Sequence, residues 1–136
     1  MAATHVDSFL ASLKRCLANP EFLKNFYDIF MNSSEEVREK FRNTDFAHQT
    51  RVLEESLFVL AVVAQGHPNS PAWAELPRLA ARHSRADLDI RPGLYDLWLD
   101  CLLQAARNHN PDFSPEVEKA WRDTLAVEIA YLRAHH

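Results

Sequence analysis

A histidine at the end of an apolar helical pattern, His83, has the residue type and the position that could bind a metal. It closes the stretch that begins at Leu79, and a polar turn and an Arg91-Pro92 step follow it. Neutral imidazole binds transition metals well, and at a helix end its second nitrogen can meet a backbone carbonyl or a side chain. The chain has seven histidines. The alternative is therefore a hydrogen-bonded or solvated histidine on a helix face.

Two polar side chains interrupt apolar helix faces earlier in the chain. Tyr27 lies on the same stripe as Phe30, and a phenol that faces a core needs a polar partner. Gln49 lies four residues before Leu53, and its amide can donate a hydrogen bond. The alternatives are a buried tyrosine bonded to a backbone carbonyl and a rim glutamine turned to water. His48 is the second choice to Gln49, and it would need the helix to rotate by about 100°.

Composition indicates one helical domain over residues 1–136. The chain is 47% apolar and 25% charged, and it has only two glycines. Strand-and-turn architectures use glycine freely, so this scarcity favours an all-α fold. The formal charge of −4 gives no reason to expect a nucleic acid or an anionic membrane as partner.

Cysteine usage and the apolar runs bear on the compartment. Cys16 and Cys101 are far apart and are expected to pack as small apolar residues rather than to form a disulfide. The N-terminus has no charged-then-apolar signal segment. The most apolar run, residues 57–64, is too short to span a bilayer. We therefore expect a cytoplasmic protein with no membrane partner.

Helical start and stop signals divide the chain into about seven segments. Asn19-Pro20-Glu21 reads as a helix start, and Ser33 with Glu36 has the spacing of a capping box. Ser114-Pro115 caps the last helix. The first expected helix covers residues 4–18, the second follows Asn19, and a short third one runs from Ser33 to near Phe41. The fourth covers residues 46–65, and the fifth runs from Pro77 to about Ala86. The sixth runs from Pro92 to about His109, and the last begins at Ser114. Residues 66–69 would end the segment 46–65, and a short turn of helix would begin at Ser70-Pro71. Helices of unequal length with short loops fit a bundle or a globin-like packing.

An ordered set of motifs resembles bacterial globins, in particular single-domain haemoglobins and the haem domain of flavohaemoglobins. The resemblance spans roughly residues 22–132. The set consists of Phe26-Tyr27, Glu36 to Phe41, Gln49 with Leu53, His83, Ile90-Arg91-Pro92 with Tyr95, and Glu116-Val117 with Trp121. It implies a globin-like three-over-three helical sandwich, with haem between the long segment 46–65 and the helix that carries His83.

The resemblance also implies roles for individual residues. His83 would be the proximal ligand of the iron of haem b, and Tyr27 and Gln49 would be distal hydrogen-bond donors. The cofactor-binding residues that it implies are Tyr27, Phe41, Gln49, Leu53, His83, Ile90, Tyr95 and Trp98. Tyr95 could orient His83. Plain packing is the alternative for Tyr95 and for the apolar residues Phe41, Leu53, Ile90 and Trp98. Arg82 could pair a haem propionate, with a solvated arginine as the alternative.

Two features depart from the family pattern. Compared with the bacterial globins that the chain resembles, the turn from Ser84 to Asp89 is about two residues longer than usual. Flavohaemoglobins also have a glutamate late in the last helix, and the matching position would fall just past His136. Glu128 reads as a charge at the edge of that helix, since an isolated buried carboxylate would be costly.

The resemblance implies reversible binding of a diatomic gas: oxygen, nitric oxide or carbon monoxide. The enzyme alternative is nitric oxide dioxygenation with a separate reductase, because the chain has no dinucleotide-binding glycine pattern. A haem-based sensor domain of a larger protein and a haem-free helical interaction domain are two further alternatives. The physiological gas and the oligomeric state, including a homodimer, are left open.

Overall fold

The structure is a computed structural model that describes residues 5–64, 74–84, 90–111 and 113–135. These residues contain seven α-helices and no strand, as the sequence predicts. The helices are α1 (His5–Leu17), α2 (Glu21–Ser33), α3 (Glu35–Lys40), α4 (Phe46–Ala64), α5 (Glu75–His83), α6 (Gly93–His109) and α7 (Pro115–Ala134).

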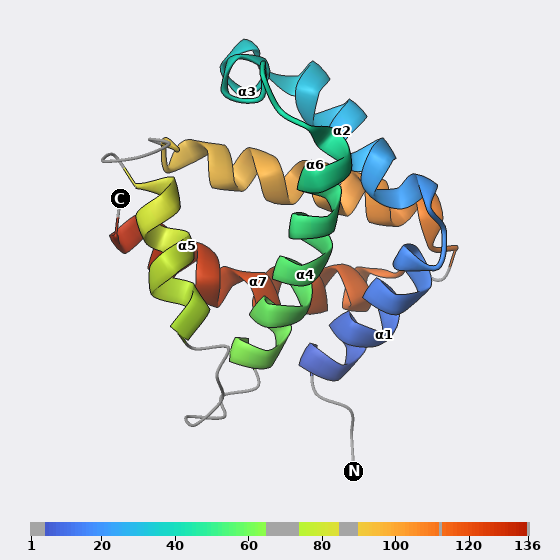
Figure 1. Ribbon diagram of the computed structural model, residues 1–136. Helices are drawn as coiled ribbons and strands as arrows, with labels where there is room; N and C mark the ends of the chain where they lie inside the picture. Colours follow the sequence, from blue (N-terminus) through green and yellow to red (C-terminus); the bar gives the residue numbers. More distant parts are fainter. Residues whose placement is uncertain (1–4, 65–73, 85–89, 112, 136) are drawn as a thin grey trace.

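The helices pack in two layers, with α1, α4 and α5 over α2, α6 and α7 (Figure 1). Extensive contacts join α1 to α7 across the layers and α2 to α6 within one layer. α4 and α5 both cross α7. The short α3 leads from α2 towards α4. This arrangement is the three-over-three sandwich expected from the sequence.

The core forms around Trp121 of α7, which is fully buried. Its ring meets Phe9 of α1 edge to face at 4.9 Å between ring centroids. The indole Nε1 donates to the hydroxyl of Ser12 at 3.0 Å. The side-chain amide of Asn110 donates to the same hydroxyl at 2.8 Å. The Ser12 oxygen therefore joins α1, α7 and the end of α6 inside the core.

The starts of α4 and α7 follow the sequence signals, whereas the start of α3 does not. Asp45 accepts hydrogen bonds from the backbone of Ala47 and starts α4, and Ser114 caps α7 as predicted. The predicted cap at Ser33 is wrong, because the cap of α3 is Ser34. The Ser34 hydroxyl accepts from the backbone of Glu36 and Val37, whereas Ser33 donates to a carbonyl of α2.

The helix that carries His83 begins earlier than predicted. Pro77 is its third residue rather than its first, so Glu75 and Leu76 precede it. The helix ends at His83, and Ser84 is extended. The expected continuation to Ala86, the helix end at residues 66–69 and the start of a short helical turn at Ser70-Pro71 lie outside the described residues. Within the described part of the chain, no helix combines the length and the hydrophobicity that crossing a membrane requires.

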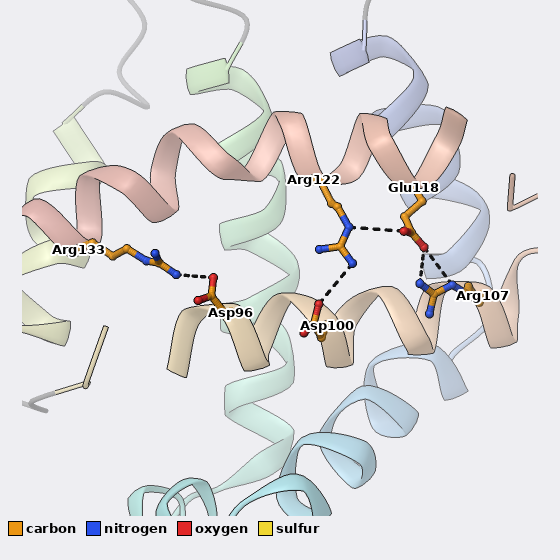
Figure 2. A network of polar contacts seen from close by, with 6 residues as sticks. All are labelled: Asp96, Asp100, Arg107, Glu118, Arg122 and Arg133. Atoms are coloured by element: carbon orange, nitrogen blue, oxygen red, sulfur yellow. Dashed lines mark hydrogen bonds and ion pairs between the residues drawn. The ribbon is translucent and has the colours of Figure 1, made fainter. Parts of the chain in front are cut away.

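Ion pairs join α6 to α7 at several points along the two helices (Figure 2). Arg133 pairs with Asp96, and Arg122 lies 3.3 Å from Asp100. Farther along, Glu118 pairs with both Arg107 and Arg122. The hydrogen bond from Arg107 holds the pKa of Glu118 below its usual value. These pairs are partly exposed, and such pairs typically stabilise a fold by less than about 1 kcal/mol each.

Candidate functional site

A largely apolar cavity lies between the two layers and receives side chains from α2 to α7. Counted out to its open mouth, and so including some open solvent, its volume is about 980 Å³. All eight residues predicted from the sequence line it: Tyr27, Phe41, Gln49, Leu53, His83, Ile90, Tyr95 and Trp98. The fold therefore brings the whole predicted set together.

The ring of His83 is held by the helix that carries it. Its Nδ1 lies 2.8 Å from the carbonyl oxygen of Leu79, one turn earlier in α5. A carbonyl oxygen only accepts, so Nδ1 carries the proton and the lone pair of the neutral ring is on Nε2. A backbone acceptor at one imidazole nitrogen is the usual partner of a histidine that ligates metal through the other. His83 is half-buried and lines the cavity.

An aromatic cluster positions Tyr27 in the cavity wall. Its ring lies 4.9 Å from Phe26, 6.1 Å from Phe41 and 5.4 Å from Phe46, measured between ring centroids. The Tyr27 hydroxyl donates to the backbone carbonyl of Gln49 at 3.5 Å. Burial raises the pKa of Tyr27 to about 12, and a contact with the side chain of Gln49 offsets part of that rise. The phenol therefore keeps its proton, and remains a donor, at any physiological pH.

The side chain of Gln49 is half-buried in the same wall, whereas that of His48 is exposed. The geometry thus separates the two residues that sequence reasoning weighed against each other. Gln49 contacts Tyr27 through its backbone carbonyl, and its side chain lowers the pKa of the Tyr27 hydroxyl.

Tyr95 is buried at the start of α6, with its ring centroid 6.3 Å from that of His83. The residue that fixes Nδ1 of His83 is Leu79, so the predicted orienting role of Tyr95 is not needed for this nitrogen. Burial raises the pKa of Tyr95 to about 12. Ile90 begins the approach to α6, and its backbone N–H donates to the carbonyl of His83 at 2.9 Å.

Glu128 of α7 is a cavity residue that sequence reasoning missed. It was expected at a helix edge, yet the structure buries it completely. Neither carboxyl oxygen has a hydrogen-bond partner among the described residues. Burial raises its pKa to about 7, and its own backbone amide offsets only part of that rise. The available signal was its spacing, because Leu125, Glu128, Ile129 and Leu132 form one helical stripe.

Charged residues gather near the cavity on α3 and at the approach to α6. Arg91 pairs with Glu36 at 3.1 Å and so connects the start of α3 to the segment after His83. Lys40 lines the cavity with an exposed side chain. Arg82 is exposed beside His83. No group of three or more His, Cys, Asp or Glu side chains that could hold a metal ion occurs in the described part of the chain.

Comparisons with known proteins agree with this geometry. The family model for globins matches residues 10–132. The chain therefore belongs to the globin family. A solved crystal structure, that of the protein PA3967 from Pseudomonas aeruginosa PAO1, is described as structurally highly homologous to a human haemoglobin. It matches with a TM-score of 0.91 and 40% sequence identity, over 97% of this chain and 98% of that one. A search of curated proteins finds no match to the chain.

Proposed function

We propose that this globin binds haem b and, through it, a diatomic gas reversibly, with His83 as the proximal iron ligand. The observation that carries the proposal is the 2.8 Å contact between Nδ1 of His83 and the Leu79 carbonyl, made at the wall of the cavity. That contact leaves Nε2 as the nitrogen with metal-binding capacity.

The residues around His83 suit a flat, mostly apolar group with polar edges. Leu53, Leu94, Leu125 and Ile129 supply buried apolar surface on the wall of the cavity. Apolar surface that is removed from water by such contacts stabilises the complex by about 25 cal/mol per Å² buried. Lys40 at the cavity is a cation of the type that pairs with a carboxylate. The residues present therefore fit haem, whose ring is apolar and whose propionates are anionic.

Haem iron would supply the bond to oxygen, nitric oxide or carbon monoxide. The chain would supply the surroundings of that bond. Tyr27 would donate a hydrogen bond to the bound gas, with the Gln49 amide as a second donor. A donor in a buried site interacts more strongly with a ligand that accumulates negative charge, as oxygen does, than with carbon monoxide. The apolar wall would exclude bulk water from the same space.

Absorption spectra of the purified protein, ferric and ferrous, test the proposal. The expected result is a Soret band together with a ferrous spectrum that changes on addition of carbon monoxide and returns when the gas is removed. Protein that remains colourless after reconstitution with hemin would overturn the proposal. The imidazole ligand is tested separately, by replacement of His83.

A further inference from the structure

Two unsatisfied polar side chains lie on one face of α7. Both carboxyl oxygens of Glu128 and the hydroxyl of Thr124 are buried without a hydrogen-bond partner among the described residues. The two positions are four residues apart, so their side chains are neighbours on the helix. Glu128 lines the cavity, whereas Thr124 is buried and does not line it. Buried polar groups without partners are uncommon in folded proteins and call for an explanation.

Among the described residues that line the cavity with Glu128, the only fixed cation is Lys40, and its side chain is exposed. From α5, His83 faces the cavity, and its Nδ1 is bonded to a backbone carbonyl. From α6, Tyr95 faces it, and from α4 no ionisable side chain lines it. The face of α1 that packs on α7 is apolar apart from Ser12 and Cys16, and burial raises the pKa of Cys16 to about 11. From α2 and α3, Tyr27 and Lys40 line the cavity.

A carboxyl group in such a place responds to any change of charge in the cavity. Interactions between charges are several-fold stronger in a protein interior than in water. A ferric haem core has one more positive charge than a ferrous core. A positive charge in the cavity favours the carboxylate, and its loss favours the protonated acid.

We propose that Glu128 is a redox-linked proton site, protonated when haem in the cavity is ferrous and ionised when it is ferric. The inference rests on the proposed haem function. In the coupled step, a one-electron reductant delivers an electron to the iron, and a proton from solvent forms the O–H bond of the Glu128 carboxyl. No other bond changes. The total charge of the cavity is then the same in both oxidation states. Glu128 thereby makes the oxidation state of the protein depend on pH.

Potentiometric titration of the reconstituted protein at several pH values between 6 and 8 tests the inference. The ferric-to-ferrous ratio at fixed potential is expected to rise with pH, by up to tenfold per pH unit, or about 59 mV for one electron. Glu128→Gln keeps the shape of the side chain and removes its titration, so the dependence should become markedly weaker. Glu116→Gln, an exposed change on the same helix, should leave the dependence unchanged.

Infrared difference spectroscopy supplies an independent readout in the wild-type chain. With the glutamate carboxyls labelled with carbon-13 and the haem unlabelled, reduction should produce the labelled carbonyl band of one protonated glutamic acid. The absence of that band, or an equal pH dependence in Glu128→Gln, would overturn the inference while haem binding stands. Failure of the wild type to bind haem would instead overturn the proposed function, and the inference with it.

Discussion

The hydroxyl of Tyr27 on α2 lies 3.5 Å from the backbone carbonyl oxygen of Gln49 on α4. This distance is at the outer limit for a hydrogen bond, so the contact is weak. The aromatic neighbours Phe26 and Phe41 fix the ring, while the hydroxyl proton rotates freely about its own bond. The donor can therefore turn to a stronger acceptor in the cavity at small cost.

Replacement of Tyr27 by phenylalanine should speed oxygen dissociation from the haem-loaded protein. Loss of one hydrogen bond to the bound oxygen reduces its stabilisation by about 1–1.5 kcal/mol, which corresponds to a roughly tenfold faster dissociation rate. Carbon monoxide should dissociate at nearly the same rate as before. Stopped-flow measurement of both gases checks the prediction. Tyr131→Phe, on the far part of α7 outside the cavity, is the control. Unchanged oxygen dissociation in Tyr27→Phe would show that the hydroxyl does not contact the gas.

The haem-free protein should lose stability as pH rises from about 4.5 to about 7 because of Glu128. The carboxyl ionises near 4.5 in the unfolded chain and near 7 in the folded one, since burial disfavours its charge. The folded state therefore binds more protons in that window. The contribution of Glu128 to the free energy of unfolding is fully present below pH 4.5 and is lost above about pH 7. The total loss across this window is about 3 kcal/mol.

Urea denaturation of the haem-free protein at several pH values measures this effect. Glu128→Gln should reduce the fall in unfolding free energy across the window and should be more stable than the wild type at pH 8. Glu116→Gln, which is exposed, should follow the wild type. Parallel curves for the wild type and Glu128→Gln would contradict the burial of this carboxyl.

Replacement of Ser12 by alanine should destabilise the fold without any direct effect on the cavity. The Ser12 oxygen accepts from Trp121 and from Asn110, and all three side chains are buried. Removal of that acceptor takes one hydrogen bond from each of two buried donors. The free energy of unfolding should therefore fall by about 2–4 kcal/mol. Chemical denaturation gives the value. Ser8→Ala, a half-buried change one turn earlier, should cost less than about 1 kcal/mol.

The helices and the cavity residues follow from the sequence because local signals and the fold agree at most positions. Pro92 precedes α6 and Ser114 caps α7, as their residue types predict. The start of α3 could not be settled in this way, since Ser33 and Ser34 both carry a hydroxyl that can cap a helix. The backbone decides between them, because Ser34 is extended while Ser33 still belongs to α2.

Glu128 shows where residue type misleads. Its spacing in α7 places it on the inward stripe between Leu125 and Ile129, and the periodicity alone would have buried it. A carboxylate is expected at the surface because burial of its charge is costly. The rise of its pKa to about 7 resolves the conflict, because the group can be buried as a neutral acid. The sequence contains no local signal for that protonation.

Hemin titration of the His83→Ala variant tests the central claim most directly, because it removes the proposed iron ligand alone. The wild type should bind hemin with a Soret band that saturates at one equivalent. His83→Ala should bind it far more weakly and with a shifted band, and added imidazole should restore much of the wild-type spectrum. His48→Ala, an exposed change on α4, should match the wild type. Equal affinity and the same Soret band in His83→Ala and the wild type would contradict the account.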